Sequence, residues 1–104
     1  MTMAVRDSNL IPLGYTSLDD VSASKGLEDG TGGAIPANAR FALVQAIDND
    51  VNWRDDGTNP VVGNQGGFRL VADDSFLYSG NLQALEFIES VSGSTADVNV
   101  MFYK

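Results

Sequence analysis

The stretch ADVNVMFYK, residues 96–104, decides the fold. Its apolar residues Val98, Val100 and Phe102 stand at every second position, so they share one face of an extended strand. Asn99 and Met101 fall between them and face the other way. This period of two predicts a β-strand that buries one face in a protein core.

Toward the N-terminus, other short β-prone segments recur between clusters of Gly, Asp and Asn. Such clusters favour turns, because these residues tolerate the backbone angles that a tight turn requires. Pro12 restricts the first predicted strand to the edge of a sheet, and Val51 and Trp53 are predicted to face inward in the third. Before the final strand, strands are predicted at residues 10–18, 39–46, 51–54, 68–71 and 75–78.

Residues 82–89 fit two patterns. Apolar residues three apart suit a short helix, whereas Leu85 and Phe87 alternate as in a strand. The turn residues on both sides and the short length favour the strand. The same patterns place most aromatic side chains at inward strand positions: Trp53, Phe41, Phe68, Phe76, Phe87 and Phe102.

Many short strands with polar turns predict an all-β protein, an antiparallel β-sandwich or jelly-roll-like barrel. We expect residues 35–104 to form this core. Residues 1–34 have scattered apolar residues and end in the glycine-rich stretch at residues 30–33, which indicates a flexible joint. They are therefore predicted to form an extended N-terminal arm with one or two short strands.

Composition excludes several classes of function. The 104 residues contain no Cys and no His, which rules out a Ser-His-Asp triad, a Cys nucleophile and the usual zinc ligands. The chain has 14 acidic and 6 basic residues, a net charge of -8, so it should repel nucleic acid and anionic membranes. No apolar run is long enough to span a bilayer or to act as a signal peptide. We expect no enzyme activity and no cofactor.

Two groups of polar residues are candidate sites. The oxygen-bearing residues near position 50 have a spacing that could bind calcium, but they lack the glycine and the glutamate of an EF-hand loop. A solvated turn is the favoured interpretation, and we expect no metal. Arg54 is expected to form a local ion pair with Asp55 or Asp56, or to pair with a carboxylate on a neighbouring subunit. The oxygen-bearing group consists of Asp48, Asp50, Asn52, Asp55 and Asp56.

Residues 35–104 resemble small virion proteins of tailed bacteriophages. The similar segments are IPANAR at residues 35–40, ALVQA at 42–46, VNWRDDGTNP at 51–60, LEFIE at 85–89 and VNVMFYK at 98–104. Residues 1–34 are not part of the resemblance. It implies a head decoration, or cement, protein with a jelly-roll-like fold, commonly a trimer on the capsid surface. It carries no catalytic residue to this chain.

On this interpretation the protein is made in the host cytoplasm and binds the major capsid protein on the outside of the shell. We expect a homotrimer with neither nucleic acid nor membrane as a partner. A tail, neck or head-fibre component of the virion is the nearest alternative. The arm and the loop after residue 53 supply the expected interface residues: Leu10, Ile11, Leu13, Tyr15, Arg54, Asp55 and Asp56.

Two further classes of function fit the sequence. A carbohydrate-binding β-sandwich would expose an aromatic face built from Trp53, Tyr78 or Tyr103, with calcium at Asp48 and Asp50. A small enzyme on a cupin-like sandwich is the third candidate, and the absence of His counts against its metal-dependent form. The fold alone implies none of these functions.

Overall fold

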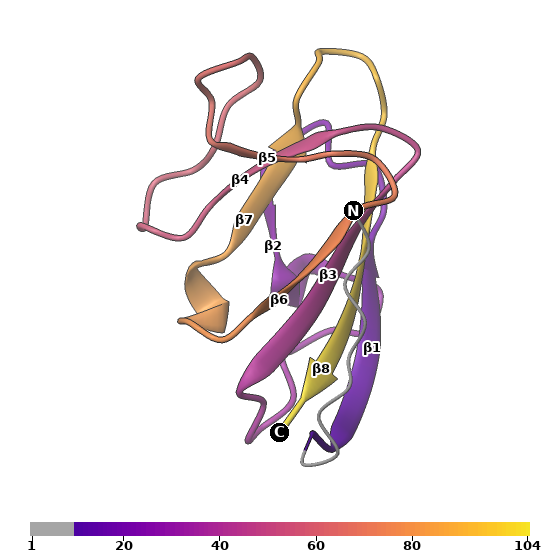
Figure 1. Cartoon of the computed structure of the whole chain (residues 1–104), viewed down its shortest axis with the longest axis vertical. Coiled ribbons are helices and arrows are strands. Elements are labelled where there is room, and N and C mark those ends of the chain that lie inside the picture. Colours follow the sequence, from indigo (N-terminus) through magenta and orange to yellow (C-terminus); the bar gives the residue numbers. More distant parts are fainter. Residues whose placement is uncertain (1–9) are drawn as a thin grey trace.

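The structure is a computed structural model that describes residues 10–104. Within these residues the chain forms eight β-strands and two single turns of 3-10 helix, with no cis peptide bond (Figure 1). The turns are η1 (Leu27–Asp29) and η2 (Leu82–Ala84). The strands are β1 (Pro12–Leu18), β2 (Lys25–Gly26), β3 (Phe41–Ile47), β4 (Val51–Arg54), β5 (Phe68–Leu70), β6 (Ser75–Tyr78), β7 (Glu86–Glu89) and β8 (Asp97–Tyr103).

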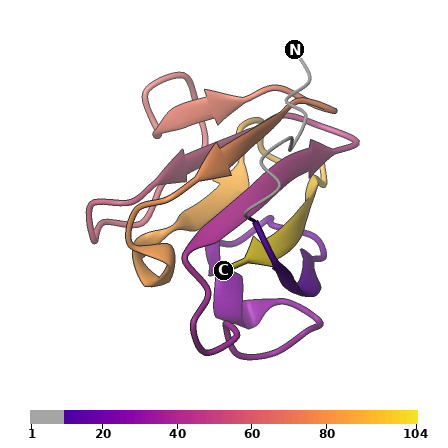
Figure 2. The same cartoon turned by 60° about the horizontal axis from the view of Figure 1, so that its bottom comes forward.

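The strands form two antiparallel sheets. Sheet A has the order β1-β8-β3-β6, and sheet B has the order β2-β7-β4-β5. The first strand pairs with the last, the second with the seventh, the third with the sixth and the fourth with the fifth. This pattern is a long hairpin rolled into two layers, which is the topology of a jelly roll. The predicted all-β antiparallel sandwich is confirmed, and Figure 2 shows β7 lying behind β3 and β6.

The core lies between the sheets and follows the alternation seen in the sequence. Val98, Val100 and Phe102 of β8 are buried, as predicted. On β3 the inward residues are small, and the register places Ala42 beside Phe102 and Ala46 beside Val98. Small and large side chains therefore alternate across the two central strands of sheet A, which leaves room for sheet B to pack against them.

The boundary between arm and core differs from the prediction. Residues 12–18 form β1, which pairs with β8, and Leu18, Val21 and Leu27 are fully buried in the core. The glycine-rich stretch is not a free joint: a Cβ atom on Gly30 would lie only 2.1 Å from Thr16 Oγ1, so the stretch packs tightly on β1. Residues 10–34 thus belong to the sandwich, while residues 1–9 of the predicted arm lie outside the described residues.

The predictions for residues 82–89 and for the aromatic side chains are confirmed in part. The strand predicted within residues 82–89 is confirmed for Glu86–Glu89, but Leu82–Ala84 form the η2 turn. Phe87 and Phe102 are buried as expected. The inward placement is wrong for Phe41, which lies on the face of β3 opposite buried Ala42. Phe68 occupies the same face of β5 as buried Leu70, opposite Trp53, but it is 73% exposed because β5 is the edge strand of sheet B.

Phe87→Ala should lower the free energy of unfolding by about 3–5 kcal/mol, because it leaves a cavity in the core. Phe68→Ala is the matched control: it removes the same side chain from the surface and should cost about 1 kcal/mol or less. Urea denaturation of both variants measures the difference. Equal losses would contradict this account of the core.

Candidate functional site

The predicted interface residues fall into two groups on different sheets. Residues 10–15 lead into and begin β1, the edge strand of sheet A. Residues 54–56 lie at the end of β4 in sheet B and in the loop after it. The two groups therefore belong to two separate surfaces.

The first group is attached to the sandwich. Ile11 and Lys104 exchange two backbone hydrogen bonds of 3.3 and 2.9 Å, and the Tyr15 hydroxyl donates to Asn99 Oδ1 at 2.7 Å. Ile11 and Tyr15 are 53% and 55% exposed, whereas Leu10 and Leu13 are half-buried. These side chains thus border sheet A instead of extending away from it.

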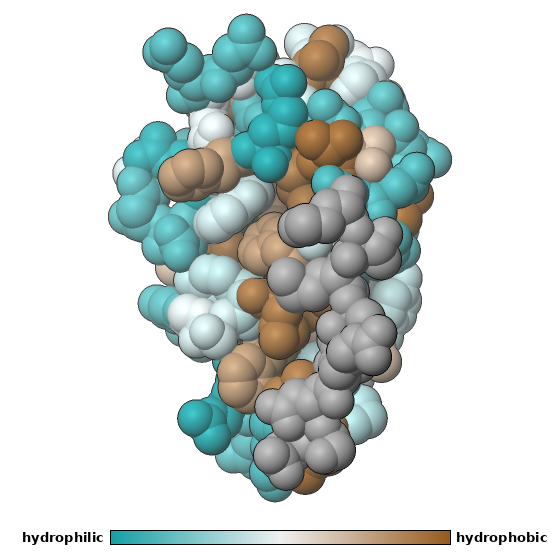
Figure 3. Space-filling view, in the orientation of Figure 1, coloured by the Kyte–Doolittle hydropathy of each residue, from teal (hydrophilic) through white to brown (hydrophobic). Residues whose placement is uncertain are grey.

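The outer face of sheet A, meaning its side turned away from sheet B, carries apolar residues on three adjacent strands. Tyr15, Met101 and Leu43 are direct neighbours in the register of β1, β8 and β3. Phe41 and Tyr103 form a second neighbouring pair on the same face. Figure 3 shows hydrophobic side chains in a band along the middle of the molecule, over β3 and β6.

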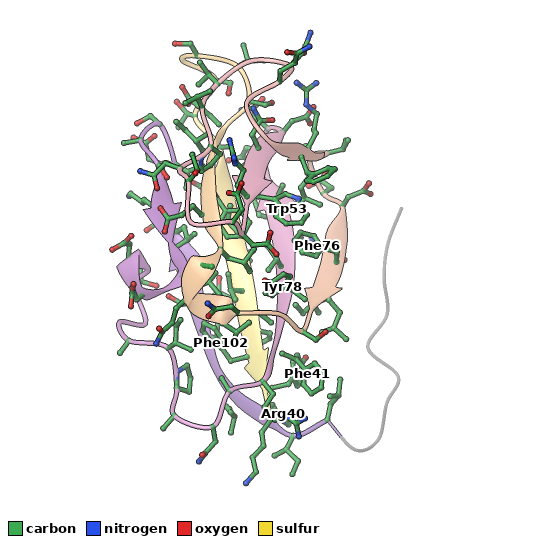
Figure 4. The ribbon with its side chains drawn as sticks, turned by 90° about the vertical axis from the view of Figure 1, so that its left-hand side faces the viewer. Arg40, Phe41, Trp53, Phe76, Tyr78 and Phe102 are labelled. Carbon is green, nitrogen blue, oxygen red and sulfur yellow. The ribbon has the colours of Figure 1, made fainter. Side chains whose placement is uncertain are left out.

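This face contains a shallow hollow of about 320 Å³, lined in part by Tyr15, Leu43 and Met101 together with Gln45 and Asn99. At one end of the face the guanidinium of Arg40 lies 5.8 Å from the centre of the Phe41 ring, and both side chains are labelled in Figure 4. An antiparallel sheet that meets only water carries polar residues on its outer side. The apolar rows therefore make this face a candidate contact surface.

The second surface lies where sheets A and B meet at their edge strands β5 and β6. Trp53 of β4 is its centre: the ring stacks on Phe76 at 5.0 Å, approaches Phe68 at 5.5 Å and meets the edge of Tyr78 at 6.5 Å. Figure 4 shows Trp53, Phe76 and Tyr78 following one another along the sandwich. We call these four residues the edge cluster. It closes this side of the core, so the predicted inward position of Trp53 agrees with the structure.

Charged residues border the edge cluster. Arg54 donates from two guanidinium nitrogens to the Asp56 carboxylate, with Nε at 3.0 Å from Oδ1, so the expected local ion pair forms with Asp56. The hydrogen bond lowers the pKa of Asp56 and raises the pKa of Arg54. The pair is exposed and contributes little to stability.

Asp55 has a different partner. The Tyr78 hydroxyl donates to Asp55 Oδ2 at 2.8 Å. Burial, together with this hydrogen bond and the carboxylate charge, raises the pKa of Tyr78 to about 12. A hollow of about 380 Å³ opens beside these groups, and its lining consists of Arg54, Asp55, Asp56, Gln65, Gly67 and Phe68.

The loop after β4 is held in place by Asn52 of that strand. Asn52 is fully buried on the outer side of β4, and its amide donates to the carbonyls of Val61 and Gly63 at 2.9 and 2.8 Å. A Cβ atom on Gly66 would lie 1.6 Å from the Val61 carbonyl oxygen, so only glycine fits there. The residues that lead into Phe68 are therefore held in place.

The oxygen-bearing residues near position 50 do not converge on a cation. Asp50 Oδ1 accepts from the Ala72 N–H at 2.8 Å, Asn52 binds the loop, and Asp55 and Asp56 bind Tyr78 and Arg54. Within residues 10–104, no three acidic side chains gather closely enough to hold a metal ion. The same part of the chain has no helix that could cross a membrane.

Comparison of the chain with family models, with curated protein sequences and with solved structures finds no match to any of them.

Sequence reasoning found Arg54, Asp55 and Asp56 but missed Phe68 and Gln65, which complete the hollow around them. It also missed Leu43 and Met101 on the outer face of sheet A. A signal was present for these two, because residues 41–47 and 98–103 carry apolar residues on both faces of their strands. Strands of that kind are covered on both sides.

Asp55→Asn should lower the pKa of Tyr78 from about 12, because it removes a negative charge and weakens the hydrogen bond. The value should stay above the ordinary 10, because burial is the larger cause. Ultraviolet absorbance titration of tyrosinate measures the shift, with Tyr78→Phe identifying the transition. Asp56→Asn should leave the pKa of Tyr78 unchanged. A fall of this pKa to the ordinary value in either variant would contradict the role given to burial.

Stability should also fall above pH 10. Unfolded Tyr78 loses its proton near 10, whereas folded Tyr78 keeps it to about 12, so the unfolded state gains the ionised form first. The free-energy difference between wild type and Tyr78→Phe should therefore shrink as pH rises from 10 to 12. Denaturant titrations at each pH measure it, and a constant difference would show that Tyr78 is not perturbed.

Proposed function

We propose that the protein is a structural bacteriophage virion protein, a decoration protein that binds the outer surface of the capsid shell. The observation that carries the proposal is the outer face of sheet A. Tyr15, Met101 and Leu43 form a continuous apolar row across three strands, beside the pair Phe41 and Tyr103.

The energetics favour a large partner. Full burial of a fully exposed Leu or Met side chain contributes about 1.5–3 kcal/mol. Tyr15 is 55% exposed and the other four residues are already half-buried, so a single copy of this face supplies only part of that amount per residue toward the costs of association. Repetition over a symmetric shell multiplies single contacts that are weak on their own. A flat sheet face suits a protein surface better than a small ligand.

Charge distribution points the same way. The outward positions of β3 carry no charge, and those of β8 carry one, Asp97. The partner surface is therefore expected to be apolar as well. Of the 14 acidic residues only Asp97 lies in these two strands, and the net charge of -8 would keep the protein away from packaged DNA and other polyanions.

The resemblance of residues 35–104 to small virion proteins supports the choice of the major capsid protein as partner and of a homotrimer as the assembly. The jelly-roll topology is compatible with this role but is shared by proteins with many functions. A tail, neck or head-fibre position would use the same face. The place in the virion is decided by which particle part binds the purified protein.

Leu43→Asp should abolish binding to purified shells that lack the protein, because it places a charge in the centre of the apolar row. Val91→Asp is the matched control, since Val91 is 62% exposed in a loop outside sheet A. Co-sedimentation with shells measures binding, and circular dichroism checks that both variants fold. Leu43→Ser gives a second, uncharged variant that should weaken binding.

If wild type does not bind shells, or if Leu43→Asp binds as well as Val91→Asp, the decoration proposal is wrong. Binding to tails or necks but not to shells would keep the structural role and correct the location. Light scattering of the free protein tests the trimer separately.

A further inference from the structure

The hollow at the edge cluster has the features of a small-molecule site that a shell-binding role does not explain. Phe68 is the most exposed of the large apolar side chains in residues 10–104, at 73%. It lines the hollow of about 380 Å³ together with Arg54, Asp55, Asp56 and Gln65. Exposure of an aromatic ring to water is unfavourable in free energy, and an exposed ring beside polar groups is typical of a binding surface.

The Phe68 ring is packed on one side before any ligand arrives. One side of it lies near Trp53, with ring centres 5.5 Å apart. Gly67 has a positive φ of 155°, and a Cβ atom there would meet the Trp53 carbonyl oxygen at 2.7 Å, so the backbone of β5 packs directly on β4. A ring fixed in this way loses little conformational entropy on binding.

Three polar groups of the hollow, Arg54, Asp55 and Asp56, are held by hydrogen bonds and keep unused hydrogen-bonding capacity. Asp55 Oδ2 accepts from Tyr78, and each carboxylate can accept about four hydrogen bonds. Asp56 is held by Arg54, whose guanidinium has about five N–H donors and uses two of its nitrogens for this pair. Gln65 adds both a donor and an acceptor.

We propose that this hollow binds a neutral saccharide. A pyranose ring has an apolar C–H face that packs on an aromatic ring, and hydroxyl groups at its rim that both donate and accept. Phe68 provides the platform, Asp55 and Asp56 accept from sugar hydroxyls, and Arg54 and Gln65 donate to them. Two carboxylates against one guanidinium leave the hollow negative, which disfavours acidic sugars and phosphates.

The saccharide site is independent of the proposed function. Its residues belong to β4, β5 and the loop between them in sheet B, whereas the proposed shell contact is on the outer face of sheet A. Both surfaces can be occupied at once in one molecule. On a decorated particle the site would give the virion a weak, many-fold repeated affinity for glycans.

The test is titration of the full chain with neutral oligosaccharides of glucose, galactose, mannose and N-acetylglucosamine, followed by amide NMR shifts. The single Trp53, which lies against Phe68, gives a fluorescence readout as well. We expect weak binding that shifts the amides of Phe68 and Gln65. Phe68→Ala should weaken it about tenfold, and Asp55→Asn should weaken it too. Val91→Ala, an exposed apolar residue elsewhere, is the control and should not.

Sialyllactose and a short peptide of mixed sequence serve as competing ligand classes. Tighter binding of either than of every neutral sugar overturns the proposal. So does binding by no neutral sugar up to about 10 mM, or equal affinity in wild type and Phe68→Ala. Leu43→Asp should bind sugars like wild type, which separates failure of this site from failure of the shell contact.

Discussion

Antiparallel pairing of β8 with both β1 and β3 is the contact on which the rest of the sandwich depends. β8 is the second strand of sheet A, and its inward residues Val98, Val100 and Phe102 are buried in the core. Its register against β3 sets small residues beside large ones, and its register against β1 brings residues 12–18 into the sheet. A shift of one residue would turn Asn99 and Met101 into the core and Phe102 out of it. Both candidate surfaces rely on this register, since it fixes the outer row of sheet A and positions β6 for the edge cluster.

Much of the sandwich could be predicted from local pattern. The period of two located β3, β4 and β8, and polar turns marked the ends of these strands and of β6. The strand predicted at residues 10–18 is present as β1. The arm predicted over residues 1–34 did not anticipate that residues 10–34 pack on the sandwich, because β2 is only two residues long and because Leu18, Val21 and Leu27 are buried by long-range contacts without any local period. In the candidate site, Arg54, Asp55 and Asp56 were found as a charged turn. The sequence did not predict that Phe68 lies at the surface, because its exposure depends on β5 being the edge strand of sheet B.

The two surfaces divide the molecule by chemistry. The outer face of sheet A is broad and largely uncharged, so it suits a protein partner whose affinity comes from buried apolar area. The hollow beside Phe68 is small and rich in fixed polar groups, so it suits a ligand recognised by directional hydrogen bonds. The first binding surface is the outer face of sheet A. The hollow is lined by residues of β4, β5 and the loop between them in sheet B, so the two binding surfaces do not overlap. A rigid β framework without catalytic His or Cys is adequate for both, because neither requires chemistry on a bond.

The pairing of the first strand with the last also governs how the chain reaches this fold during synthesis. Pro12 and Tyr103 are register partners, so the outer pair of sheet A joins residues about ninety positions apart. β1 leaves the ribosome first and has no partner until residue 103 has emerged, and β2 waits for β7 in the same way. The jelly roll therefore closes only after β8 has been synthesised. Until then β1 lacks its partner strand in sheet A, so its backbone N–H and C=O groups are open to pairing with another chain.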